Sequence, residues 1–365
     1  MGWGTLRAAI ERAFSHGRSS VAIVFSGGEP LLEFSLIEQA VRYIRQNAFS
    51  GKRVRLFLVT NGTMLDEEKI LFFAEHGFDI QLSFDGVRAA QDFRGKHTFE
   101  SLDHLLDVLS ERHPHLYRSH LTVSMTVTPQ AVRHLAESVE YFLSKRVERL
   151  EISPSIGDCS DWQRAGVEKL ERQFSRIVNS SLLHFRSTGK IPLMLFRNGG
   201  ARNRSAAPSS AWIPGTSRRM CGIMRGQKLA VDVDGEVFAC ATLVGSCQRL
   251  PSKLLRRTAE TMRIGNIRSK TFLENRARFL KDAHRAEIFY RKENKYSSYG
   301  PCRDCRYFAA CGVCPVSIGH IPGNEDPNRV PDFSCAFTLA AGKYRERFCR
   351  RAFSRTQAAS VDPAS

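Results

Sequence analysis

The chain has 365 residues, of which 42% are hydrophobic and 25% charged, a composition typical of a globular protein with a full-sized core and a second, smaller domain. Lys and Arg number 54 against 37 acidic residues, so the formal net charge is +17 and acidic partners are favoured. No helix-turn-helix pattern, RNA-binding signature or aromatic-basic stripe accompanies this charge, which argues against nucleic acid as the partner. No apolar run approaches the ~20 residues of a membrane span, and the first residues lack the apolar core of a secretory signal. We therefore expect a cytoplasmic protein whose ten cysteines serve as metal ligands before disulfides.

Short β-branched runs alternate with helical patterns over the first 156 residues. The opening residues are amphipathic and predict a helix, and further helices are expected at 32–46 and 99–111. The runs predicted as strands are VAIVF (21–25), VRLFLVT (54–60), DIQLSF (79–84), LTVSMTV (121–127) and RLEIS (149–153). This alternation predicts βαβ units around a parallel sheet, open or curled toward a barrel.

The second half of the chain changes character. After one more helix, a stretch rich in Gly, Ser, Pro and Arg is typical of a linker or mobile loop, and a hairpin, a basic helix and a cysteine-dense region follow. These predicted segments are the helix 162–184, the linker 197–219, the hairpin 229–240 with its turn at Asp234-Gly235, and the basic helix 271–292. The polar residues after about Arg351 predict a disordered tail.

The first three predicted strands end in small polar residues, in the segments FSGGEP, TNGT and SFDG. Loops after the carboxyl ends of parallel strands share one rim, so these segments should lie together. Turn formation alone explains any one of them, whereas three on the same rim favour a polar small-molecule site. Glycines there let a ligand approach the backbone closely. Acceptors and donors for an amino group and a ribose come from Glu29, Asn61, Ser83 and Asp85.

In that order and after successive strands, FSGGEPLL, TNGTML and LSFDG resemble the radical S-adenosylmethionine (radical SAM) enzymes. The resemblance covers most of residues 3–157 and implies an α/β fold, a partial (β/α)6 barrel that binds SAM on this rim. The residues implied to contact SAM are Gly27, Gly28 and Glu29 at its amino group, Ser83 and Asp85 near its ribose or carboxylate, Asn61 beside them, and Ser124 and Ile156 as further candidates.

One departure from that family is large. Its defining Cys-x3-Cys-x2-Cys element precedes the GGEP strand, whereas the first cysteine of this sequence is Cys159. The printed chain therefore lacks the thiolates for the iron that would bind and reduce SAM. Met1–Leu6 resembles the start of the helix that follows the missing cluster loop, so we expect an N-terminally truncated barrel. Because the three rim motifs are intact, a truncated or misassigned start is favoured over a remnant that has lost SAM cleavage.

Cysteines are densest near the end of the chain, where the spacing reads Cys-x2-Cys-x5-Cys-x2-Cys. A Cys-x2-Cys turn points two thiolates at one metal centre. Zinc ribbons separate their pairs by about 12 or more residues, so this short gap suits a compact cluster loop better than a zinc site. The cysteines of the pattern are Cys302, Cys305, Cys311 and Cys314, with Cys335 after them and Cys221 and Cys240 before.

The order of these cysteines over residues 215–345 resembles the SPASM domain, which is appended to radical SAM enzymes that modify peptides and proteins. The resemblance implies up to two auxiliary [4Fe-4S] clusters, although the last gap holds two residues where the family has three. The implied ligands are Cys302, Cys305, Cys311 and Cys335 for one cluster, and Cys221, Cys240 and Cys314, with Cys247 as a candidate fourth, for the other. Outside the pattern, Cys159 and Cys349 are interpreted as structural thiols, and His113, His115 and His120 as part of a solvated loop.

Together the two resemblances imply a maturase that modifies a peptide or protein by 5′-deoxyadenosyl radical chemistry, with an acidic leader peptide and a reductant such as flavodoxin or ferredoxin as partners. Sulfatase maturases typically carry Asp after the cysteine that matches Cys240, where this chain has Ala241, so peptide crosslinking is favoured. The alternatives are a non-catalytic iron-sulfur electron-transfer or binding protein and a zinc-stabilised binding module. The expected domains are the barrel at 1–157, a connecting helix and linker at 158–214, the SPASM domain at 215–345 and a polar tail at 346–365.

Overall fold

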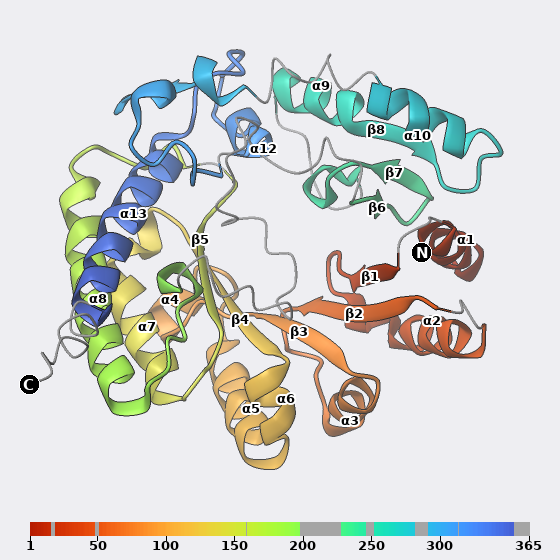
Figure 1. Cartoon of the computed structure of the whole chain (residues 1–365), viewed down its shortest axis with the longest axis horizontal. Coiled ribbons are helices and arrows are strands. Elements are labelled where there is room, and N and C mark those ends of the chain that lie inside the picture. Colours follow the sequence, from red (N-terminus) through yellow and green to blue (C-terminus); the bar gives the residue numbers. More distant parts are fainter. Residues whose placement is uncertain are drawn as a thin grey trace, which may run out of the picture.

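The computed structural model describes residues 1–15, 19–47, 51–157, 159–197, 228–245, 252–281, 291–312 and 314–353. Five parallel strands form one curved sheet in the order β1-β2-β3-β4-β5 (Figure 1). Their bounds are β1 (Ser20–Phe25), β2 (Arg53–Thr60), β3 (Phe78–Ser83), β4 (Leu121–Val127) and β5 (Leu150–Pro154). Each strand begins and ends within one residue of its prediction, which confirms the parallel α/β fold.

Helices cover the outer face of this sheet (Figure 1). Apolar residues at alternate strand positions pack against them, as Leu56, Ile80 and Val123 do in the core of the barrel. The helices of this part are α1 (Trp3–Phe14), α2 (Phe34–Gln46), α3 (Glu67–Glu75), α4 (Arg88–Gln91), α5 (Phe99–Arg112), α6 (Pro114–Ser119) and α7 (Leu135–Ser144), with short 3-10 helices η1 (Pro30–Glu33) and η2 (Gln130–His134).

The other face of the sheet is polar. Strand register pairs Gln81 with Thr122 and Ser83 with Ser124, so these side chains share the face that turns away from the helices. The register continues this face into β5 through the pairs of Ser124 with Glu151 and of Thr126 with Ser153. An inner face of hydroxyl, amide and carboxylate groups suits a polar ligand rather than a packed core.

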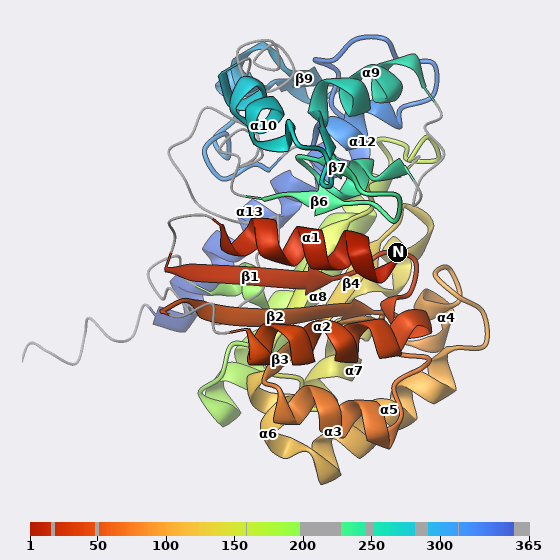
Figure 2. The same ribbon diagram turned by 90° about the vertical axis from the view of Figure 1, so that its right-hand side faces the viewer.

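A second core lies above the barrel and contains a small antiparallel sheet of order β6-β7-β8 (Figure 2). The turn at Gly235 confirms the predicted hairpin, whereas the third strand was missed because a strand of four residues has too short an alternation to detect. The predicted basic helix is helical over Phe272–Lys281, residues 282–290 lie outside the described part, and Lys292 begins a short 3-10 helix instead of ending this one. The elements are β6 (Ala230–Val231), β7 (Glu236–Phe238), η5 (Ala241–Leu243), α9 (Lys253–Met262), β8 (Arg263–Asn266), α10 (Phe272–Lys281) and α12 (Pro315–Gly319).

Helix α1 contacts both cores. Helix α1 lies between β1 and the small sheet, where Ala8 and Ala9 pack against the second core and the Arg12 guanidinium lies 5.9 Å from the centre of the Phe272 ring (Figure 2). At the other side, the long helices α8 (Gly166–Thr188) and α13 (Asp332–Phe353) pack along each other beside β5 (Figure 1).

Helix α13 reaches further than the sequence predicts. It starts in the expected SPASM domain and continues to Phe353, so residues 346–353 are helical where a polar tail was expected. Phe348 is fully buried, and its ring stacks on Phe196 with 4.5 Å between ring centres. The helix therefore completes the core of the barrel. The predicted linker lies almost wholly outside the described residues, as do residues 354–365.

Candidate functional site

The carboxylate of Glu29 joins the first two rim loops. Oε1 accepts hydrogen bonds from the backbone N of Leu31 at 3.1 Å and from Oγ1 of Thr60 at 2.8 Å, and Oε2 accepts one from the backbone N of Asn61 at 2.8 Å. The Asn61 side-chain oxygen in turn accepts from the backbone N of Thr63 at 2.9 Å. The loops after β1 and β2 are thus fixed to each other, as the shared-rim argument predicts. A carboxylate offers about four lone-pair sites, so Glu29 retains capacity to accept from an ammonium group.

The two glycines before Glu29 leave open space beside the backbone. Gly27 and Gly28 are both exposed, and a Cβ added to either residue would meet no atom within 4 Å. Gly62 in the second loop differs. Its φ is +79°, and a Cβ added to it would lie only 2.4 Å from Cδ1 of Leu82. Gly62 is therefore required by packing, whereas Gly27 and Gly28 leave room for a ligand to reach the main chain.

The third rim motif is held by a buried ion pair that the sequence did not reveal. Asp85 is 6% exposed, and its Oδ1 accepts from Nη2 of Arg94 at 2.8 Å and from the backbone N of Thr126 at 2.7 Å. Oδ2 accepts from Nε of Arg94 at 2.9 Å, which makes the pair bidentate. Asp85 thus ties the loop after β3 to the end of β4. Arg94 lies in a polar segment without a motif of its own, so only the fold identifies it.

The remaining rim candidates lie on β3, on β4 and beyond β5. Ser83 and Ser124 are paired neighbours on the inner face, and neither hydroxyl has a hydrogen-bond partner among the residues that the structure describes. Ile156 follows β5 and is 37% exposed. All eight SAM-contact candidates therefore occupy the rim or the adjoining inner face, and their contacts with SAM stay a prediction.

The structure brings together Cys302, Cys305, Cys311 and Cys335, which we call the four-cysteine set. Burial raises the pKa of the Cys335 thiol to about 12, and the other three cysteines add to the rise because their charges lie close. Burial likewise raises the pKa of Cys302 to about 11, with Cys311 and Cys305 contributing. Cys302 is the first residue of the short helix η9 (Cys302–Asp304). The backbone N of Cys305 donates a hydrogen bond to the carbonyl oxygen of Cys302 at 3.1 Å.

A separate pair consists of Cys240 and Cys314. Burial raises the pKa of Cys314 to about 11, and among the described cysteines only Cys240 adds to the rise. Cys314 lies at the N-terminal end of α12, and Cys240 follows β7 with its Sγ 2.9 Å from Oγ1 of Thr242. Cys221 and Cys247 lie outside the described residues. Six of the described cysteines thus lie in two groups that are consistent with the sets implied by the SPASM resemblance, and their role as cluster ligands stays a prediction.

The four-cysteine set fits an iron-sulfur cluster. Four cysteine thiolates are the usual ligands of a [4Fe-4S] cluster, and each must lose its proton on binding. In the described part of the chain, no three His, Cys, Asp or Glu side chains gather closely enough to hold a single metal ion.

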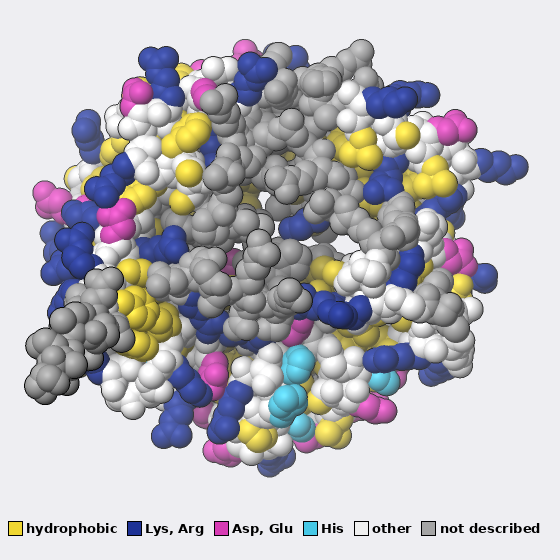
Figure 3. Space-filling model, in the orientation of Figure 1, with side chains coloured by type: hydrophobic (Ala, Val, Ile, Leu, Met, Phe, Trp, Pro, Cys, Tyr) yellow, Lys and Arg dark blue, Asp and Glu magenta, His cyan; other side chains and the backbone are white. Residues whose placement is uncertain are grey.

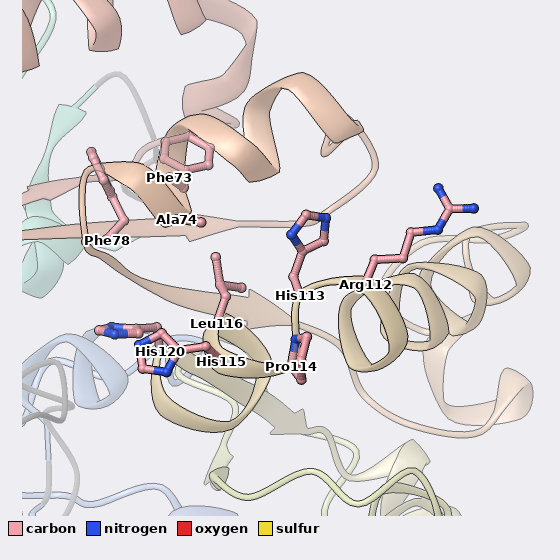
Figure 4. Close-up of a pocket in the computed structure, with 10 residues that line it drawn as sticks. Phe73, Ala74, Phe78, Arg112, His113, Pro114, His115, Leu116 and His120 are labelled. Atoms are coloured by element: carbon pink, nitrogen blue, oxygen red, sulfur yellow. The ribbon is translucent and has the colours of Figure 1, made fainter.

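The histidines and the other two cysteines lie elsewhere. A 260 Å³ pocket beside α6 is lined by His113, His115 and His120 (Figure 4). Helix α6 precedes the first residue of β4, so the pocket lies at the end of that strand opposite the rim. Nε2 of His113 lies 3.0 Å from Glu67, and Nδ1 of His120 lies 3.1 Å from Asp79, so two of the three are paired with carboxylates. Cys159 lies in the turn after β5, and Cys349 lies within α13; neither joins the cysteine sets.

On the face of the molecule shown in Figure 3, the Lys and Arg side chains that are coloured are scattered instead of forming one stripe. Among the described residues, no helix is long and apolar enough to span a bilayer.

Comparison with known proteins matches two families. The Radical SAM superfamily matches residues 4–141, and SPASM, an iron-sulfur cluster-binding domain, matches residues 221–306. These two matches cover the rim motifs and most of the cysteine pattern.

The relatives include sulfatase-maturating enzymes. The serine-type anaerobic sulfatase-maturating enzyme of Klebsiella aerogenes is 24% identical over 64% of this chain and 56% of its own length. The cysteine-type enzyme of Clostridium perfringens is 21% identical over 85% of this chain and 78% of its own. The chain thus spans little more than half of the first relative.

Solved structures share the fold. Native anSMEcpe with bound AdoMet superimposes with a TM-score of 0.70 at 18% identity, covering 97% of this chain and 91% of that one. Streptococcus suis SuiB bound to S-adenosylmethionine superimposes with a TM-score of 0.52 at 13% identity, covering 92% of this chain and 70% of that one. The chain therefore contains a radical SAM domain at residues 4–141 and a SPASM iron-sulfur cluster-binding domain at residues 221–306.

Proposed function

We propose that this chain is a radical SAM/SPASM maturase that modifies a peptide or protein substrate by 5′-deoxyadenosyl radical chemistry. The observation that carries the proposal is the presence, in one chain, of a GGEP rim fixed by Glu29 and a half-buried four-cysteine set. The names of the relatives and the two family matches support it.

Its cofactors are SAM and [4Fe-4S] clusters, which supply the radical and the one-electron chemistry when bound. Within this chain, the exposed backbone at Gly27 and Gly28 and the carboxylate of Glu29 bind the amino group of SAM. The hydroxyls of Ser83 and Ser124 face its polar groups. The four-cysteine set ligates one cluster. Cys240 and Cys314, together with Cys221, ligate the other.

The substrate is a peptide segment. Serine-type and cysteine-type sulfatase-maturating enzymes are among the relatives, and SuiB has been solved with its precursor peptide SuiA. Because Ala241 follows Cys240 in this chain, we favour thioether or carbon-carbon crosslinking of a ribosomal peptide over sulfatase maturation. The net charge of +17 would attract an acidic leader peptide, and flavodoxin or ferredoxin is the proposed reductant.

Anaerobic reconstitution tests the cofactor assignment. We expect about eight irons per chain and a broad visible absorbance. Cys335→Ser should reduce the iron content, whereas the matched control Cys349→Ser, on the same helix but outside the set, should not. Zinc at about one per chain without visible absorbance would contradict the proposal and favour a zinc-stabilised module.

The alternative function is a non-catalytic iron-sulfur electron-transfer or binding protein. It needs the same cysteines, so iron content does not separate it from a maturase. Formation of 5′-deoxyadenosine under reducing conditions does, since only a maturase cleaves SAM. The assay should compare this chain with one extended upstream in the same reading frame. An extension that encodes Cys-x3-Cys-x2-Cys, brings iron to about twelve per chain and confers cleavage would establish the maturase.

A further inference from the structure

Two lysines are buried beside the four-cysteine set without a carboxylate partner. Lys292 is 5% exposed and Lys295 is 1% exposed. Nζ of Lys292 donates to the backbone oxygen of Phe308 at 3.0 Å, and Nζ of Lys295 donates to that of Pro327 at 2.8 Å. Neither lysine forms an ion pair within the described residues. Nζ of Lys292 also lies 5.5 Å from the centre of the Phe308 ring. An ammonium has three protons to donate, so one carbonyl each leaves both buried charges incompletely compensated.

The local chain path places both lysines against the cysteines. Lys292 opens the 3-10 helix η8 (Lys292–Asn294), and Lys295 follows it. The chain then forms the hairpin of β9 (Tyr296–Ser297) and β10 (Gly300–Pro301), which returns it so that the backbone N of Cys302 donates to the carbonyl of Lys295 at 2.8 Å. Phe308, the partner of Lys292, lies in the loop between Cys305 and Cys311.

Once deprotonated, as cluster binding requires, these cysteines are the strongest negative influence on both lysines. Burial lowers the pKa of both lysines, that of Lys295 to about 8. A negative charge on Cys302 would raise the pKa of both lysines, and one on Cys311 would raise the pKa of Lys292. The other opposing charges are Glu293 near Lys292 and Asp326 near Lys295, and Asp326 already accepts from the Tyr296 hydroxyl at 2.8 Å.

We propose that Lys292 and Lys295 are the counter-charges of the iron-sulfur cluster held by the four-cysteine set and that they raise its reduction potential. A [4Fe-4S] core with four thiolates has two net negative charges when oxidised and three when reduced. Nearby ammonium groups stabilise the reduced form more than the oxidised one, because the attraction grows with the charge of the cluster. Ser297 acts in the same direction, since its hydroxyl donates to Sγ of Cys335 at 3.1 Å.

This inference rests on the iron-sulfur assignment of the proposed function and not on its radical chemistry. The test is an EPR-monitored redox titration of the reconstituted full chain, with Lys292→Met, Lys295→Met and the double variant. Cys335→Ser identifies which EPR signal belongs to this cluster. Each Lys→Met variant should lower the ratio of reduced to oxidised cluster at a fixed potential about tenfold, equivalent to about 59 mV for one electron.

Arg303→Met is the matched control. Arg303 adjoins Cys302, but its side chain is 70% exposed, so removing its charge should change the ratio less than twofold because water screens it. An unchanged ratio in both lysine variants at full iron content would overturn the inference, as would a control that shifts it equally.

If a Lys→Met variant loses iron, its potential cannot be measured. The Lys→Arg variant at the same position, which keeps the positive charge, then tests whether charge or side-chain shape is required. Iron and potential retained by Arg but lost by Met would support the counter-charge role. Iron lost from both variants would overturn it, because the requirement would then be for side-chain shape. Absence of iron from the wild-type chain would instead refute the cluster assignment in the proposed function.

Discussion

Asp85→Ala should destabilise the barrel even when no SAM is bound. The change removes a buried carboxylate and leaves the Arg94 guanidinium and the backbone N of Thr126 without their acceptor. Breaking a buried ion pair costs about 3–5 kcal/mol, and the 29% exposure of the Arg94 side chain places this case near about 3 kcal/mol. At about 2–4 °C per kcal/mol, the melting temperature should fall by about 6–12 °C in a thermal denaturation scan.

Two further variants isolate the pair. Asp85→Ala combined with Arg94→Met should cost less than the two single changes added together, by about 1 kcal/mol or more, because the double variant leaves no unpaired buried charge. Glu100→Ala removes the exposed partner of Arg88 and should cost less than about 1 kcal/mol. A melting temperature of Asp85→Ala within 2 °C of wild type, or additive single changes, would refute the bracing role and leave Asp85 as a ligand contact.

Three other predictions concern the rim, the closing helix and the thiols. Gly86→Ala should lower the free energy of unfolding by about 3 kcal/mol or more in thermal denaturation, because the φ of Gly86 is +105° and an added Cβ would lie 2.1 Å from the Cβ of Ser138. Gly28→Ala has open space for its Cβ, so it should leave stability unchanged but weaken SAM binding in calorimetry. Equal stability of the two variants would contradict the packing requirement at Gly86. Phe348→Ala should cost about 3–5 kcal/mol, since the ring is fully buried, and a near-neutral change would exclude α13 from the barrel core. The metal-free chain should lose stability as pH rises from about 8.5 toward 12, because the thiol of Cys335 keeps its proton in the folded chain and releases it in the unfolded chain. In urea unfolding at these pH values, Cys335→Ser should lose less stability than the wild type. Equal losses would contradict this role of the Cys335 thiol.

Local patterns in the sequence were sufficient for the strands and for the position of the rim. The five β-branched runs appear as strands within one residue of prediction, because a buried parallel strand requires a short apolar run whatever lies around it. The rim followed from topology, since the carboxyl ends of parallel strands must lie at one edge. Cysteine spacing likewise predicted a compact cluster loop, whereas the division into two ligand sets was implied by the resemblance to the SPASM domain and stays a prediction.

Partners that are distant in the chain required the tertiary structure. Asp85 meets Arg94 and the backbone of Thr126, and neither contact follows from a periodic pattern. Helix α13 belongs to the barrel core because Phe348 stacks on Phe196, although its last residues appear polar in the sequence.

Lys292 and Lys295 show the same limit. Lysine in a polar segment is normally solvated, and only the hairpin that returns the chain to Cys302 buries both ammonium groups beside the thiols. Periodicity and spacing reflect the local backbone, so the sequence by itself determined which elements form and which residues can be ligands. Burial and charge pairing depend on which segments fold against one another, so the tertiary structure alone decided which carboxylate braces the rim and which cations accompany the cysteines.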